Sequence, residues 1–220
     1  MRSIYEPFQR HFRPRRLRLF YSCFRITEET RVLDLGGGLY FWELAKSEGF
    51  PVPQVTVLNI RPGPAQLLPE VRWLIGDARS TGLESFSFDI VFSNSLVEHL
   101  GDAPSQAQFA LEVRRLAPDY FVQTPDRRFP IEPHFIAPFL HWFPKGIRRR
   151  SIRNFSLWGL THRPSGAKCA ELVREIRLLS GPEMKGLFPD GRLLVERFLG
   201  MPKSVIACRI ARHSNTGEIL

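Results

Sequence analysis

Short apolar runs separated by glycine, proline and polar residues recur along the first 125 residues of the chain. Runs of this kind are typical of buried strands in a parallel sheet. They predict strands over residues 32–35, 54–60, 71–75, 88–93 and 120–123. Helical spacing of apolar residues over 41–48 and 106–116 predicts helices between strands. The alternation of strand and helix indicates an α/β protein with a doubly wound parallel sheet.

The pattern changes after residue 125. Prolines, aromatics and basic residues crowd together over 125–166, and no helical or strand period is visible there. A loop of this length inside a domain is typical of a lid or a binding wall. Helical spacing returns over 169–179, and two final strands, over 194–199 and 204–210, are close enough for an antiparallel hairpin. The predicted fold is therefore a seven-stranded, mostly parallel sheet with an antiparallel C-terminal hairpin.

This pattern divides the chain into a main domain and its appendages. We expect a basic helical extension over residues 1–25, a main domain over 26–212 with the insertion at 125–166, and a frayed tail over 213–220. The extension holds seven arginines against one glutamate, out of a net charge of +9 for all 220 residues. Its interleaved apolar residues fit a helix packed on the core. A phosphate-bearing substrate, RNA or peripheral contact with an anionic membrane would suit the charge as well.

The composition indicates the cellular location that we expect for this protein. The three cysteines, Cys23, Cys169 and Cys208, are far apart in sequence and lack any metal-binding spacing. We therefore expect a reducing compartment and no metal. No apolar run is long enough for a transmembrane segment, and the N-terminus lacks a signal-peptide core. A cytoplasmic location is the simplest expectation.

The segment from Arg31 to Trp42 carries the strongest chemical signal. A buried strand ends in Asp34, and three glycines, Gly36–Gly38, precede a helix. Glycines let a ligand approach the backbone, and the helix N-terminus offers N–H groups. A dinucleotide would bring a pyrophosphate, which Asp34 would repel. The dinucleotide-binding sequence motif also requires a third glycine at the position that Phe41 occupies here. The ammonium and sulfonium of S-adenosylmethionine would instead be stabilised by a carboxylate.

The motifs in their order resemble the class I S-adenosylmethionine-dependent methyltransferases, particularly the type 11 subgroup. The segments VLDLGGG, IGDA and FDIVFSNSLVEHL are similar to the first, adenine-contacting and fourth-strand motifs of that family. The resemblance implies a Rossmann-like methyltransferase fold with S-adenosyl-L-methionine as cofactor. It places the cofactor against Asp34, Gly36, Gly37, Gly38, Asn59, Asp77, Ala78, Ser93 and Asn94.

Asn59 departs from the family pattern. Members of the family commonly end the second strand with an acidic residue that accepts hydrogen bonds from both ribose hydroxyls. An amide offers only one acceptor oxygen and no charge. We therefore expect either weaker cofactor binding or a turn-forming role for Asn59.

Methyl transfer needs a base only when the acceptor arrives protonated, as a hydroxyl does. His134, with Glu132 two residues before it, and His99 after the fourth strand are the candidate catalytic residues. The resulting hypothesis is a methyltransferase acting at oxygen on a small-molecule, glycan or lipid acceptor. RNA methylation is the alternative enzymatic activity. Asn94 is followed by Ser95-Leu96 rather than by two prolines, which argues against a nucleic-acid acceptor. A catalytically silent binding module is the alternative outside enzymes.

Overall fold

The computed structural model describes residues 6–211, with side chains from residue 12 onward. Its main sheet has the strand order β3-β2-β1-β4-β5-β9-β8. The strands are β1 (Arg31–Leu35), β2 (Gln54–Asn59), β3 (Val71–Ile75), β4 (Ile90–Asn94), β5 (Asp119–Pro125), β8 (Arg192–Phe198) and β9 (Met201–Arg209). The first five are parallel and β9 runs antiparallel between β5 and β8. The predicted fold class and C-terminal hairpin are confirmed.

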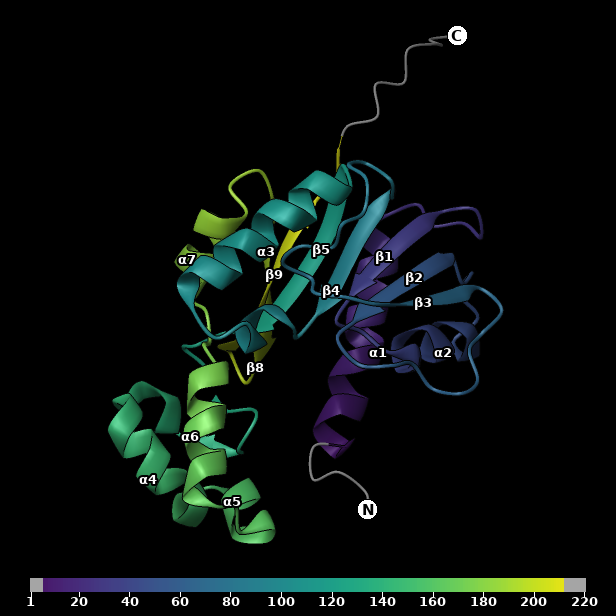
Figure 1. The fold of residues 1–220 in the computed structure, drawn as a ribbon. Coiled ribbons are helices and arrows are strands. Elements are labelled where there is room, and N and C mark those ends of the chain that lie inside the picture. Colours follow the sequence, from purple (N-terminus) through teal and green to yellow (C-terminus); the bar gives the residue numbers. More distant parts are fainter. Residues whose placement is uncertain (1–5, 212–220) are drawn as a thin grey trace, which may run out of the picture.

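Helices cover both faces of this sheet (Figure 1). The helices of residues 6–211 are α1 (Glu6–Cys23), α2 (Leu39–Ser47), η1 (Val97–His99), α3 (Ala103–Leu116), η2 (Leu140–Trp142), α4 (Lys145–Phe155), α5 (Leu157–His162), α6 (Gly166–Glu175) and α7 (Gly181–Leu187). Successive residues of a strand point to opposite faces. Val32 accordingly packs with α1 and α2, whereas Leu33 packs with α3 and α7. The result is a three-layer α/β/α arrangement.

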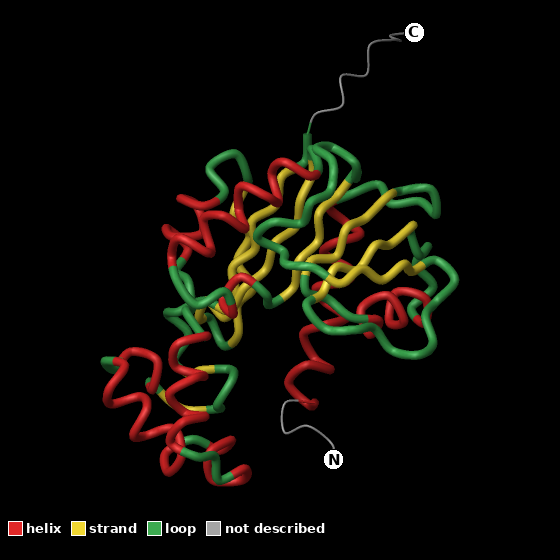
Figure 2. Tube along the Cα trace, viewed as in Figure 1, coloured by secondary structure: helices red, strands yellow, loops and turns green. Residues whose placement is uncertain are grey.

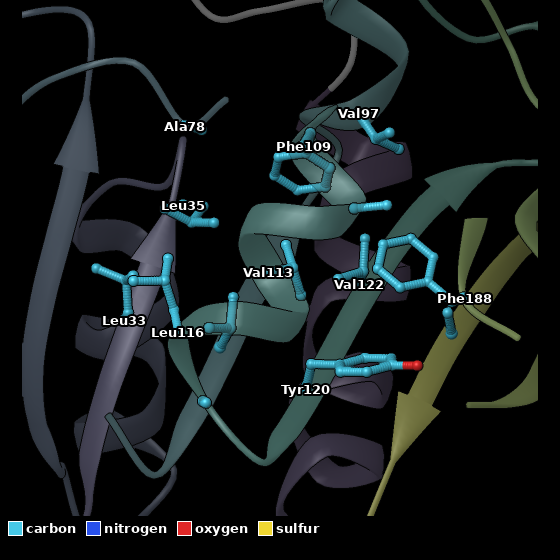
Figure 3. Close-up of a cluster of buried hydrophobic side chains, with 14 of the residues drawn as sticks. Leu33, Leu35, Ala78, Val97, Phe109, Val113, Leu116, Tyr120, Val122 and Phe188 are labelled. Atoms are coloured by element: carbon cyan, nitrogen blue, oxygen red, sulfur yellow. The ribbon is translucent and has the colours of Figure 1, made fainter. Parts of the chain in front are cut away.

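The core between the sheet and α3 is made of aliphatic and aromatic side chains (Figure 3). Phe109, Val113 and Leu116 recur at helical spacing and are fully buried. On the opposite face, Phe20 of α1 lies among six aromatic neighbours, including Phe92 at a ring separation of 4.9 Å. The expected packing of the N-terminal helix on the core is confirmed.

The segment after β5 folds into a body of its own, beside the sheet in the tube view (Figure 2). It contains a small hairpin of β6 (Ile131–Glu132) and β7 (Ala137–Pro138), followed by η2, α4 and α5. Together with α6 it has a separate apolar core that includes Phe135, Ile152 and Val173. The sequence showed no period here, yet two helices form.

One helix boundary differs from expectation. The helix predicted to end at Leu179 ends at Glu175, because Leu179 pairs with the chain after β5 and accepts a hydrogen bond from the Arg127 backbone N–H. The predicted frayed tail over 213–220 lies outside the described residues. Within residues 6–211, none of the helices combines the length and apolar character needed to cross a bilayer.

Candidate active site

The site forms where the carboxyl ends of β1 and β4 lie side by side. From these two neighbours the chain proceeds in opposite directions, to β2 and to β5. Ligands of open α/β sheets bind at such a switch point. The glycine turn after β1 lies here: Gly36 has φ +75°, which favours glycine, and its N–H donates to the Leu58 carbonyl at 2.8 Å. Gly38 is the extended N-cap of α2 and faces open space.

Asp34 lies directly beneath this turn. A Cβ on Gly37 would overlap the Asp34 carboxylate, so only glycine fits there. The carboxylate is 1% exposed, and its Oδ2 accepts a hydrogen bond from Trp42 Nε1 at 3.0 Å, while Oδ1 has no partner. Burial raises the pKa of Asp34 to about 7, against the opposing Trp42 hydrogen bond. A buried, unsatisfied carboxylate oxygen is costly unless a cation or donor reaches it.

Asn59 takes part in holding the glycine turn. Its Nδ2 donates to the carbonyls of Gly37 at 2.9 Å and Gly36 at 3.3 Å, and its Oδ1 accepts from the Arg61 backbone N–H at 3.1 Å. An acidic residue could not donate to these carbonyls. This geometry gives a physical reason for an amide where the family commonly has a carboxylate.

Asp77, which the family resemblance predicts to contact the adenine, follows β3. Its carboxylate is held by Arg79, with an Nη2–Oδ2 distance of 2.6 Å. The Arg79 hydrogen bonds keep the pKa of Asp77 below its ordinary value. Ala78 beside it is buried in the core.

The two candidate residues of β4, Ser93 and Asn94, make different contacts. Ser93 is fully buried and its hydroxyl donates to the Leu35 carbonyl at 3.0 Å, which joins β4 to β1. Asn94 Oδ1 accepts from Arg16 Nη1 at 2.5 Å. Arg16 also forms a two-point ion pair with Glu196 of β8, at 2.6 and 3.1 Å. Sequence reasoning had placed Arg16 only within a basic helix, because its partners are 78 and 180 residues away.

The three candidate catalytic residues meet beyond the ends of β4 and β5. His134 Nδ1 lies 2.7 Å from Glu132 Oε1, and His134 Nε2 lies 3.1 Å from His99 Nε2. Glu98, which sequence reasoning missed, completes the group with Oε1 4.0 Å from His134 Nε2. Its position next to His99 in the sequence was the available signal.

The pKa values of the two histidines are shifted in opposite directions. Burial lowers the pKa of His134, but the Glu132 hydrogen bond and the charges of Glu132 and Glu98 outweigh it, so the net shift is upward. Desolvation by the surrounding groups lowers the pKa of His99, although the charge of Glu98 raises it. When the pair takes up one additional proton, His134 is therefore the preferred carrier.

Comparison with known proteins agrees with this geometry. Residues 33–119 match the sequence model of the type 11 family, described as a methyltransferase domain, which spans the glycine turn, Asp77 and the fourth strand. Over these residues the chain is similar to the class I methyltransferases. A search of curated proteins finds no match.

Solved methyltransferases share its fold at low sequence identity. The Burkholderia thailandensis 1,6-didemethyltoxoflavin-N1-methyltransferase, crystallised with that compound and S-adenosylhomocysteine, has a TM-score of 0.53 and 13% identity over 90% of this chain and 77% of its own. A Haemonchus contortus phosphoethanolamine N-methyltransferase has a TM-score of 0.56 and 14% identity over 83% of this chain and 38% of its own. A Nostoc punctiforme protein described as a putative O-methyltransferase has a TM-score of 0.55 and 12% identity over 93% of this chain and 57% of its own.

The glycine turn fits S-adenosylmethionine, the methyl donor of the proteins that this chain resembles. The buried Asp34 has one oxygen without a partner, which suits a cationic ligand. Gly38 leaves open space at the N-terminus of α2. The site thus has both a carboxylate for positive charge and room for a ligand against the backbone.

Proposed function

We propose that this methyltransferase transfers the methyl group of S-adenosylmethionine to a hydroxyl oxygen of a small-molecule, glycan or lipid acceptor. The observation that carries the proposal is the contact of His134 with Glu132 beside His99, beyond the carboxyl ends of β4 and β5. Such a group is suited to removing a proton from a hydroxyl. The cofactor would lie against the glycine turn, with Asp34 beneath it.

Glu132 sets the tautomer of His134. Its Oε1 lies 2.7 Å from Nδ1, so the Nδ1–H donates to the carboxylate and the Nε2 lone pair faces His99. His99 is exposed while His134 is 19% exposed, so an acceptor reaches the pair from the His99 side. Rotation of the His99 ring would free Nε2 to accept a proton.

The chemistry leaves the protein mainly a positioning task. The acceptor oxygen attacks the methyl carbon, the carbon–sulfur bond breaks, and the sulfur departs neutral. His134 would take the hydroxyl proton. The insertion would supply the acceptor wall, since it contributes both Glu132 and His134 and presents Phe139, Trp142 and Phe143 half-exposed.

RNA methylation has less support than a small acceptor. Part of the basic charge of α1 is neutralised by ion pairs within the chain: Arg16 pairs with Glu196, and at the surface Arg18 pairs with Glu48 at 2.7 Å. A silent binding module would keep the fold without turnover. A measurement of methyl transfer distinguishes such a module from an enzyme.

The test uses S-adenosylmethionine with a labelled methyl group and a metabolite extract as the source of acceptors. Label transfer by wild-type protein and its loss in His134→Ala, with His162→Ala unaffected, supports the proposal. His162 is the matched control because its ring stacks on Trp158, away from the cluster. Normal turnover by His134→Ala contradicts the base assignment. If calorimetry detects no binding of S-adenosylmethionine or S-adenosylhomocysteine up to millimolar concentration, the proposed methyltransferase activity is refuted.

A further inference from the structure

The cluster of Glu98, His99 and His134 has the composition of a metal site. One nitrogen from each histidine and one Glu98 carboxylate oxygen lie within 4.8 Å of one another. We propose that these three residues bind one divalent first-row transition-metal ion, which binds and activates the acceptor hydroxyl. The proposed activation rests on the proposed function, whereas the metal site itself does not.

Glu98 provides the independent observation. Its side chain is fully buried, and Oε2 accepts a hydrogen bond from Thr124 at 2.9 Å. The other oxygen, Oε1, faces His134 Nε2 at 4.0 Å and has no hydrogen-bond partner. A buried carboxylate oxygen left without a donor costs free energy, and a cation at this point would satisfy it.

The distances suit a single ion. With metal–nitrogen bonds of about 2.1 Å, the 3.1 Å between the two Nε2 atoms corresponds to a ligand angle of about 95°, close to that of neighbouring octahedral ligands. Ligand atoms on opposite sides of such an ion are about 4.2 Å apart, so closing the cluster requires shifts of at most roughly 0.6 Å. The two imidazole rings meet edge to face, with their centroids 4.7 Å apart.

Glu132 then acts as the partner that orients a ligand. Metal-binding histidines commonly donate their second N–H to a carboxylate, which fixes the tautomer and strengthens the ligand. The Glu132 contact to His134 Nδ1 at 2.7 Å has this form. Glu132 Oε2 is itself held by the Phe135 backbone N–H at 2.7 Å. The carboxylate is therefore fixed before any ligand arrives.

Two imidazoles and one carboxylate favour zinc, iron, cobalt or manganese over magnesium or calcium, which prefer oxygen ligands throughout. Three protein ligands leave positions for the acceptor. A coordinated hydroxyl loses its proton to solvent more easily, and its oxygen attacks the methyl carbon while the carbon–sulfur pair of electrons stays on sulfur. With the ion bound, His134 Nε2 is a ligand, and the metal replaces it in promoting deprotonation.

The experiment titrates chelator-treated, full-length, tag-free protein with Co²⁺, Zn²⁺ and Mn²⁺, followed by calorimetry and, for Co²⁺, by visible absorption. We expect one ion per chain for at least one of these metals. Affinity should fall at least tenfold in His99→Ala and in His134→Gln, and about tenfold in Glu132→Gln. His162→Ala should bind as wild type does. Circular dichroism confirms that each variant is folded, and exposed His99 is the substitution least able to disturb folding.

Absence of stoichiometric binding of all three ions overturns the proposal, as does equal affinity in wild type, His99→Ala and His134→Gln. The two proposals fail separately. Metal binding without any binding of S-adenosylhomocysteine would refute the methyltransferase function and leave the metal site standing. Label transfer at full rate by the metal-free protein, unchanged on adding the metal, would refute the role of the ion in activating the acceptor.

Discussion

The buried carboxylate of Asp34 makes cofactor binding depend on pH. Its pKa of about 7 means that it is about one-tenth ionised at pH 6 and about nine-tenths ionised at pH 8. If the positively charged cofactor binds the ionised form, its affinity should rise about tenfold over this range through Asp34 alone, equivalent to about 1.4 kcal/mol. Binding below pH 7 should also release a proton.

The matched variant is Asp34→Asn, whose amide oxygen can still accept from Trp42. Isothermal titration with S-adenosylmethionine at pH 6, 7 and 8, in buffers of different ionisation enthalpy, measures both affinity and proton release. The amino group of the cofactor titrates near neutral pH as well, so the decisive quantity is the difference between wild type and variant. Equal pH dependence in the two proteins would refute the role assigned to Asp34.

Stability gives a second measurement of the same group. Because the folded pKa is raised above the ordinary value of 3.8, the contribution of Asp34 to stability is complete below about pH 4 and is lost as the pH rises through about 7. Between pH 5 and pH 7 the cofactor-free protein should lose roughly 2 kcal/mol through this residue. Denaturant unfolding of wild type should show this loss, and Asp34→Asn should lack it.

Three other substitutions test the packing around the site. Asn59→Asp should lower the free energy of unfolding by about 1–3 kcal/mol and weaken cofactor binding in titration, because a carboxylate would face the carbonyls of the glycine turn; tighter binding would show instead that this position serves the ribose. Arg16→Met should destabilise the protein by about 3–5 kcal/mol in denaturant unfolding, because it leaves Glu196 buried without its cation, and the double variant with Glu196→Met should recover most of this loss. Ile152→Ala should cost about 2–5 kcal/mol by opening a cavity in the core of the insertion, and an unchanged melting temperature would mean that this core is loosely packed.

The parallel sheet was predictable from the sequence because its signals are local. Each strand from β1 to β5 is a short apolar run bounded by glycine, proline or polar residues, and β1, β4 and β5 are buried over most of their length. β3 spans the predicted residues, and the other strands differ by a few residues at their ends. The glycine turn was equally visible, because the motif consists of consecutive residues.

The insertion could not be predicted in this way. α4 is made mostly of basic and polar residues, and Ile152 is its one buried side chain, so few apolar residues mark this helix in the sequence. The helix is stabilised by packing against α6, whose Cys169 and Val173 share its core. Tertiary contacts therefore decided the secondary structure of this segment.

The sequence by itself determined the fold, the glycine turn and the candidate residues at the ends of the strands, because neighbouring residues carry those signals. Only the tertiary structure decided which side chains meet. His99 and His134 are 35 residues apart, and Glu98 and Thr124 are 26 apart. They converge because parallel strands bring their carboxyl ends to one edge of the sheet, and the hairpin after β5 returns to that edge.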